Sequence, residues 1–253
     1  MSITTKIFIF SFLILILIFC FWRYGVSNLL ADAIYYQIQT AEKNKDWRFV
    51  LKNYQAIFTL PLNEFAYQKE FAYSIKKGLI FYPEFKDKIK LLDYAIEHLE
   101  RNAKKFPTFY FYYHLAPLYV EKAHLTQAPE DYNKAENNFI ELKKISPLMP
   151  HFYENWILLE IYQSKLDIAI KLADEALMLL PNPNDPRSNK IHQQELSTAR
   201  AEIEQLLGEI YYQKKEYERS LNSYRKSLKL NPFSNVGIYK RMADIYKIQK
   251  NTR

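Results

Sequence analysis

Hydrophobic and polar residues follow two different patterns along the chain. From Ile7 to Trp22 the sequence contains no charged residue. Beyond Val26, small and apolar residues recur at intervals of three, four and seven, with charged residues between them. These intervals place the apolar residues on one face of an α-helix. The two patterns predict an all-α chain with two domains, residues 1–25 and residues 26–253.

The uncharged segment of residues 7–22 predicts a transmembrane helix. Its sixteen residues reach about 24 Å, short of the roughly 30 Å hydrocarbon core of a bilayer, and the flanking residues extend the span. An uncleaved anchor is favoured over a cleaved signal peptide, because no small-x-small site follows closely. Phe19 in front of Cys20 disfavours a lipoprotein signal. Lys6 and the amino terminus slightly outweigh Arg23, so we expect a single-pass membrane protein with its larger domain outside the cytoplasm.

The larger domain repeats a helical pattern that ends in proline. A small or apolar residue is followed by an aromatic or apolar residue four positions later, a third residue three later and a proline five after that. Proline closes a helix because it cannot donate the next backbone hydrogen bond. The pattern occurs at Val50, Tyr54, Ile57 and Pro61 (one residue early); Ala95, Leu99, Asn102 and Pro107; Ala135, Phe139, Leu142 and Pro147; Ala169, Ala173, Ala176 and Pro181; and Ser220, Tyr224, Ser227 and Pro232.

A second signature lies before these helices: a large residue, a small residue and then an aromatic residue one turn later. It occurs at Leu207, Gly208 and Tyr211, at Leu115, Ala116 and Tyr119, at Phe71 and Ala72, and again at Met242, Ala243 and Tyr246. Together the two signatures resemble the tetratricopeptide repeat (TPR), a helical hairpin of about 34 residues. The resemblance covers residues 28–249. It implies an α-solenoid of about five hairpins after the transmembrane helix, with some longer loops.

Gly208 takes the small position of its repeat, where the two helices of a hairpin come closest. We expect Gly208→Leu to destabilise the fold by overpacking. Alanine is a better helix former than glycine, so Gly208→Ala is expected to be mild or even stabilising.

Composition excludes most site chemistry. The chain has 4 glycines, which are widely separated, so neither a P-loop nor a dinucleotide-binding fingerprint is present. The 5 histidines show no metal-binding spacing, and the chain has 1 cysteine. The net charge of +7 is spread over the whole chain, which does not favour nucleic acid as a partner. We expect no cofactor, no metal, no small-molecule substrate and no enzymatic activity.

A TPR solenoid binds its partners on the concave surface that the first helices line. Aromatic and charged residues at the outward positions of those helices would suit an extended peptide or a partner helix, although the same positions would also suit packing between repeats. The predicted function is a membrane-tethered scaffold for another protein, including a component of a membrane complex. The predicted partner-binding residues are Lys69, Tyr73, Lys76, Tyr110, Tyr113, Trp156, Glu160, Glu209, Tyr212, Lys240 and Asp244.

A narrower resemblance suggests an alternative function. The order of a span, a helix, the segment from Asp46 to Gln68 and then TPR hairpins is similar to the soluble tail of bacterial O-antigen ligase or polymerase-like membrane proteins. Those proteins carry many spans before the tail, whereas one is predicted here. The resemblance implies a tail or split subunit of a glycan-transfer system, without catalytic residues of its own.

Overall fold

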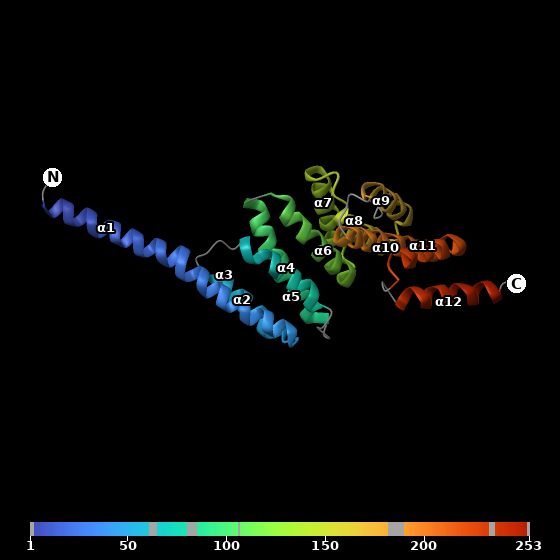
Figure 1. Cartoon of the computed structure of the whole chain (residues 1–253), viewed down its shortest axis with the longest axis horizontal. Coiled ribbons are helices and arrows are strands. Elements are labelled where there is room, and N and C mark those ends of the chain that lie inside the picture. The colour runs from blue at the N-terminus through green and yellow to red at the C-terminus, as the bar shows by residue number, and fades with distance from the viewer. Residues whose placement is uncertain are drawn as a thin grey trace. The chain divides into compact units, whose positions relative to one another are not determined.

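The predicted all-α fold of helical hairpins is confirmed by a computed structural model of the chain (Figure 1). The described residues form helices and turns, and none of them forms a β-strand. They divide into two compact units, Met1–Leu99 and Glu100–Arg253. The predicted division into residues 1–25 and 26–253 stays a prediction. The structure describes residues 3–60, 65–79, 85–105, 107–181, 190–232 and 236–251.

Unit 1 contains a long N-terminal helical segment followed by two helical hairpins. Its elements are α1 (Ile3–Phe21), a π-helical turn η1 (Trp22–Val26), α2 (Ser27–Lys43), α3 (Trp47–Thr59), α4 (Phe65–Leu79) and most of α5 (Phe85–Lys105). Aromatic rings form its core. The ring of Phe71 lies 5.0 Å from that of Tyr54 and 5.7 Å from that of Tyr94, measured between centroids. Helices α3, α4 and α5 therefore share one core.

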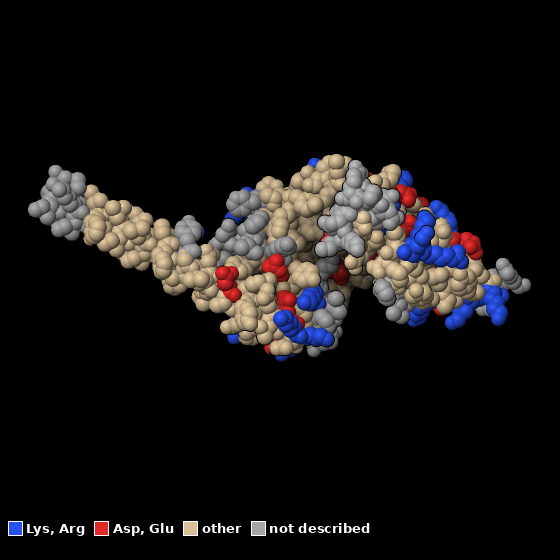
Figure 2. All heavy atoms as spheres, in the orientation of Figure 1, with Lys and Arg blue, Asp and Glu red and all other residues tan. Residues whose placement is uncertain are grey.

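Helix α1 corrects the predicted location of the protein. Its apolar side chains from Phe8 to Phe21 are mostly exposed, and Figure 2 shows this stretch without charged side chains. Within the described part of the chain, however, no helix is both long enough and apolar enough to cross a bilayer. The predicted single-pass membrane location is therefore contradicted. The physical reason lies in length, because the sixteen uncharged residues from 7 to 22 span about 24 Å of a hydrocarbon core about 30 Å thick.

Unit 2 contains three hairpins and a terminal helix. Its elements are α6 (Phe109–Thr126), α7 (Pro129–Ile145), a 3-10 turn η2 (Pro150–Phe152), α8 (Tyr153–Tyr162), α9 (Leu166–Leu179), α10 (Lys190–Gln213), α11 (Tyr217–Leu230) and α12 (Val236–Asn251). Helix α6 packs against α7, α8 against α9, and α10 against α11. The first helices also meet one another, α6 with α8 and α8 with α10. They therefore line one surface of the unit, as in a solenoid.

The second helices follow the register that the sequence predicts. Their apolar anchor residues, from Val50 and Tyr54 in α3 to Ser220 and Tyr224 in α11, are buried. Each of the helices α3, α5, α7, α9 and α11 ends two residues before a proline. At Leu60, Leu180 and Asn231 the residue between helix and proline is extended, with ψ of 122° at Leu180. A residue before proline disfavours the helical conformation, which explains the common end point.

Three hairpins turn through the same backbone conformation without glycine. Lys45, Ser164 and Lys215 have φ angles of 59°, 58° and 60°. In the turn after α10, the amide of Lys215 donates to the carbonyl of Tyr212 at 3.0 Å. The amide of Glu216 donates to the carbonyl of Tyr211 at 2.9 Å. The same bonds recur at the same offsets in the other two turns. The turn residue lies five positions before the first anchor of each second helix, so it sets the register of the hairpin.

Gly208 lies where α10 and α11 come closest. A Cβ atom at this position would stand 2.5 Å from both Cδ1 and Cε1 of the Tyr224 ring. That ring is buried, so it has no free space into which it could move. The expectation that Gly208→Ala is mild or stabilising is therefore wrong, because the clash outweighs the gain in helix propensity.

Candidate partner-binding surface

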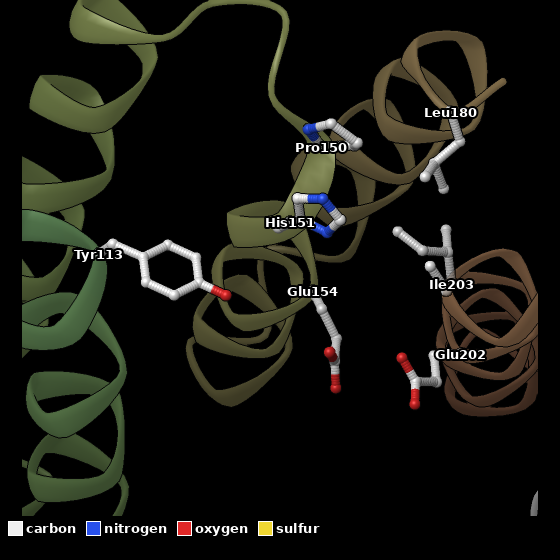
Figure 3. A pocket seen from close by; sticks show the side chains of 8 residues that line it. Tyr113, Pro150, His151, Glu154, Leu180, Glu202 and Ile203 are labelled. Atoms are coloured by element: carbon white, nitrogen blue, oxygen red, sulfur yellow. The ribbon is translucent and has the colours of Figure 1, made fainter. Parts of the chain in front are cut away.

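A pocket lies on the surface that the first helices of unit 2 line. Tyr113 reaches it from α6, Glu154 from α8 and Glu202 from α10, and Figure 3 shows these side chains converging on the same space. The pocket has a volume of about 170 Å³. The other lining residues are Pro150, His151, Leu180, Ala199 and Ile203.

The pocket is acidic. It carries the carboxylates of Glu154 and Glu202, and no Lys or Arg is among its described lining residues. Arg200 follows Ala199 in the sequence, but its guanidinium donates to the carbonyls of Leu177 and Leu180 at 3.0 and 2.8 Å. Burial, and then the charge of Glu154, raise the pKa of the Tyr113 hydroxyl. This hydroxyl is therefore protonated at neutral pH and can both donate and accept a hydrogen bond.

One of the residues predicted from the sequence, Tyr113, lines this pocket. Its neighbour Tyr110 is half-buried, with its ring 4.8 Å from that of His114. In α8, Trp156 is 9% exposed and stacks on Phe139 at 5.6 Å, while Glu160 is 1% exposed. Burial raises the pKa of the Glu160 carboxyl, an effect that Lys165 opposes. The structure thus places Trp156 and Glu160 in the interior, and their binding role stays a prediction.

The remaining predicted residues lie on α10, α12 and α4. Glu209 accepts hydrogen bonds from the guanidinium of Arg241, the shorter at 3.0 Å, and that guanidinium lies 4.8 Å from the ring centre of Tyr212. In α12, Lys240 is exposed and Asp244 is half-buried. In unit 1, Tyr73 is 62% exposed. The side chains of Lys69 and Lys76 lie outside the described residues.

Sequence reasoning missed His151, Glu154 and Glu202, all of which line the pocket. The positions in α8 were counted from Trp156, which faces the interior. Pro150 marks the start of the helical segment that leads into α8, since proline is favoured in the first turn of a helix. Counting from Pro150 would have identified Glu154 as a candidate. Glu202 lies seven residues before Glu209 on α10, a spacing that places both on one face and could have revealed it.

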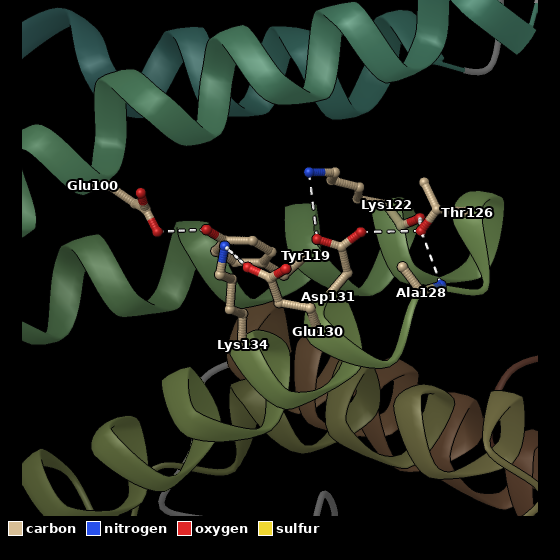
Figure 4. Close-up of polar contacts among 8 residues, drawn as sticks. All are labelled: Glu100, Tyr119, Lys122, Thr126, Ala128, Glu130, Asp131 and Lys134. Atoms are coloured by element: carbon tan, nitrogen blue, oxygen red, sulfur yellow. Dashed lines mark hydrogen bonds and ion pairs between the residues drawn. The ribbon is translucent and has the colours of Figure 1, made fainter.

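A cluster of polar side chains holds the hairpin of α6 and α7 together and joins it to Glu100 of α5 (Figure 4). Tyr119 donates to the carboxylate of Glu100. The buried carboxylate of Asp131 pairs with Lys122 at 3.3 Å and accepts a hydrogen bond from Thr126 at 3.0 Å. Buried polar groups with partners of this kind fix local geometry. We therefore assign this cluster to the structure of the hairpin rather than to binding.

Metal binding finds no support in the described residues, where no group of three or more His, Cys, Asp and Glu side chains could hold an ion. Cys20 is a free cysteine.

Comparison with known proteins identifies one repeat and a similar fold. Residues 201–234, which cover part of α10 and all of α11, match the family model of the tetratricopeptide repeat. No curated protein matches the sequence. A thermophilic TPR protein of Thermus thermophilus is 18% identical, with 83% of this chain and 98% of that chain covered and a TM-score of 0.48. The assembly chaperone of RpL4 is 16% identical, with 88% of this chain and 84% of that chain covered and a TM-score of 0.50.

These findings support TPR architecture and go no further. At this level of identity a similar structure shows the fold alone. Proteins built from this repeat generally act as scaffolds that bind other proteins on an extended surface, rather than as enzymes. Neither structure is described as an O-antigen ligase, so the narrower resemblance stays a prediction.

Proposed function

We propose that this chain is a protein-interaction scaffold whose acidic pocket binds a Lys or Arg side chain from an extended segment of a partner protein. The observation that carries the proposal is the convergence of Glu154 and Glu202, from two adjacent first helices, on one pocket beside Tyr113. Two carboxylates on an open surface attract a cation and orient it through charge-assisted hydrogen bonds. One structure with a similar fold is the assembly chaperone of RpL4.

The size of the pocket supports a side chain as its occupant. Pockets for small-molecule ligands usually measure about 300–1,000 Å³. The volume of about 170 Å³ is smaller. The Tyr113 ring offers an apolar wall to the methylene groups of a long basic side chain, whose charged end would lie between the carboxylates. An extended peptide could then continue across the neighbouring first helices.

The test is a binding measurement on the full chain with synthetic peptides that contain a central Lys or Arg. We expect the double substitution Glu154→Gln and Glu202→Gln to weaken binding about a hundredfold or more, because each of the two lost charged hydrogen bonds is worth about 1.5–3 kcal/mol. Tyr113→Ala should weaken it as well. Asp174→Asn, at an exposed position of α9, is the control for a change of charge outside the pocket.

Two readouts separate this proposal from general attraction of charge. Peptides with Gln in place of the central Lys or Arg should not compete, and the thermal midpoint of the double variant should stay unchanged. If the glutamine variant binds basic peptides as tightly as the parent chain does, the pocket is not the binding site.

A further inference from the structure

Helix α12 repeats the first-helix signature at the end of unit 2. Met242, Ala243 and Tyr246 follow Leu207, Gly208 and Tyr211 by 35 positions. In α10 these three positions are buried, and the Ser220 hydroxyl of α11 donates to the Gly208 carbonyl at 2.7 Å. In α12, Ala243 is exposed and Tyr246 is 47% exposed. The face that a second helix covers in α10 is therefore open in α12.

The opposite side of α12 is packed as the register requires. Ile238 and Ile245 are buried in one cluster with Leu221 and Tyr224 of α11. The equivalent residues of α10, Ile203 and Ile210, are buried too. Helix α12 thus takes the place of a first helix in a further repeat. Its hairpin face is left uncovered by the described part of the chain.

The open face of α12 is aromatic and basic. Tyr239 and Tyr246 lie seven residues apart on either side of Ala243, and Tyr239 is 57% exposed. Lys240 and Lys247 lie seven residues apart along the same stripe, and both are exposed. Figure 2 shows basic side chains around the C-terminal helices, with acidic side chains among them. We define this open face by Tyr239, Lys240, Ala243, Tyr246 and Lys247.

The hairpin of α10 and α11 shows what such a face accepts. Ser220 and Ser227 of α11, on either side of Tyr224, pack against α10. The Ser227 hydroxyl donates to the Ala201 carbonyl at 2.7 Å. The charges of that hairpin are ordered as well, since Glu204 of α10 pairs with Lys226 of α11 at 3.3 Å. In α12 the charged residues of the open face are both lysines. A second copy of α12 would bring lysines against lysines, whereas an acidic helix would be attracted.

We propose that the open face of α12 binds an acidic amphipathic helix of a partner protein, which completes a helical hairpin between two chains. The small residue Ala243 lets the partner helix approach closely. Tyr239 and Tyr246 give it apolar contact, and Lys240 and Lys247 pair with its carboxylates. This surface is separate from the acidic pocket, which attracts the opposite charge.

The probe is a peptide with the sequence of α11, Tyr217–Leu230, in which Arg and Lys are replaced by Glu and Tyr224 is replaced by Ala, because Ala243 carries the Cβ that Gly208 lacks. A staple on the outer face holds the helix. We expect it to bind the full chain, and we expect a scrambled peptide of the same composition to bind at least about tenfold more weakly. Ala243→Leu should weaken binding of the acidic peptide by a similar factor, because it fills the point of closest approach. The thermal midpoint of this variant should be unchanged, since Ala243 is exposed.

A reversal of charge gives the decisive comparison. Lys240→Glu with Lys247→Glu should abolish binding of the acidic peptide and create binding of the same peptide with its original Arg and Lys residues. The matched control is Lys171→Glu with Lys229→Glu, at exposed positions of α9 and α11. The Glu154→Gln and Glu202→Gln variant should bind the acidic peptide normally, so the two proposals can fail independently.

Three outcomes would overturn the proposal. The first is that the acidic peptide does not bind. The second is that the scrambled peptide binds equally well, which would indicate general attraction of charge only. The third is dimerisation of the chain that Ala243→Leu abolishes, which would make a second copy the occupant of the face.

Discussion

The hairpin of α8 and α9 and the hairpin of α10 and α11 have the same turn conformation, but the larger side chain at their interface comes from the first helix in one and from the second helix in the other. Seven residues before the turn residue, the first helix carries Ile157 in one hairpin and Gly208 in the other. Nine residues after it, the second helix carries Ala173 in one and Tyr224 in the other. All four positions are buried. A repeat thus fixes the total volume between its helices and leaves open which helix supplies it.

The two hairpins also differ in polar contacts at the helix interface. Helix α9 has alanines at the two small positions, Ala169 and Ala176, where α11 has Ser220 and Ser227. Both serine hydroxyls are buried and donate to carbonyls of α10 at 2.7 Å. The two interfaces therefore keep the same register, one by packing alone and the other by packing with two added hydrogen bonds.

The complementary side-chain volumes of Gly208 and Tyr224 predict the largest change in the free energy of unfolding. Tyr224→Ala should lower the free energy of unfolding by about 3–5 kcal/mol, because it leaves a cavity beside Gly208. Adding Gly208→Ile would copy the pair found in the other hairpin and should recover part of that loss. Urea denaturation of the two single variants and the double variant measures the coupling. Strictly additive effects would contradict the idea that the two hairpins exchange volume.

Overpacking predicts the next effect. Gly208→Leu should cost about 1–3 kcal/mol, and Gly208→Ala should cost less but remain destabilising, because its Cβ already meets the Tyr224 ring. The control is Ala243→Leu, at the equivalent but exposed position of α12, which should change stability little. A neutral Gly208→Ala would show that α10 and α11 can separate without cost.

The two serine hydrogen bonds predict a smaller loss. Ser220→Ala or Ser227→Ala should each lower the free energy of unfolding by about 0.5–1.5 kcal/mol, offset in part by the higher helix propensity of alanine. Asn222→Ala, at an exposed position of the same helix, measures that propensity gain alone. Serine variants as stable as the asparagine variant would mean that the hydroxyl bonds contribute nothing.

The shared turn predicts the smallest effect, and its sign is positive. Lys215→Gly and Ser164→Gly should each raise stability by up to about 1 kcal/mol, because glycine adopts positive φ without steric cost. The control Gln213→Gly, within the last turn of α10, should lose about 1 kcal/mol. Thermal melting of the three variants measures these changes in stability. A loss in both hairpins would show that the entropy of glycine in the unfolded chain dominates.

Periodicity was sufficient to predict the second helices, because their register depends on local spacing and on the closing prolines. The positive φ at Lys45, Ser164 and Lys215 left no mark in the sequence, because glycine and asparagine, the usual signals, are absent there. The sign of Gly208→Ala could not be predicted either. It depends on the position of a ring from another helix, and helix propensity contains no information about that distance.

The candidate site was harder to predict than the fold. Tyr113 was found by counting along α6, whereas the same counting assigned Trp156 to the groove, and the structure places Trp156 in the interior. The difference is one of register, because Trp156 lies eight residues before the turn residue Ser164, just as the buried Leu207 lies eight residues before Lys215. The small residue that marks this register in α10 is replaced by Ile157 in α8, so the sequence pattern did not reveal it. The pocket also depends on three helices at once, which no single periodic pattern describes.

The prolines that follow the second helices have a consequence for the order in which amide hydrogens exchange with solvent. The helical ladder stops at the same point of each hairpin, and proline supplies no amide to continue it. Protection against deuterium exchange should therefore rise and fall in blocks bounded by Pro147, Pro181 and Pro232 in unit 2, each block opening with its own free energy. Helix α12, with one side uncovered, should exchange first.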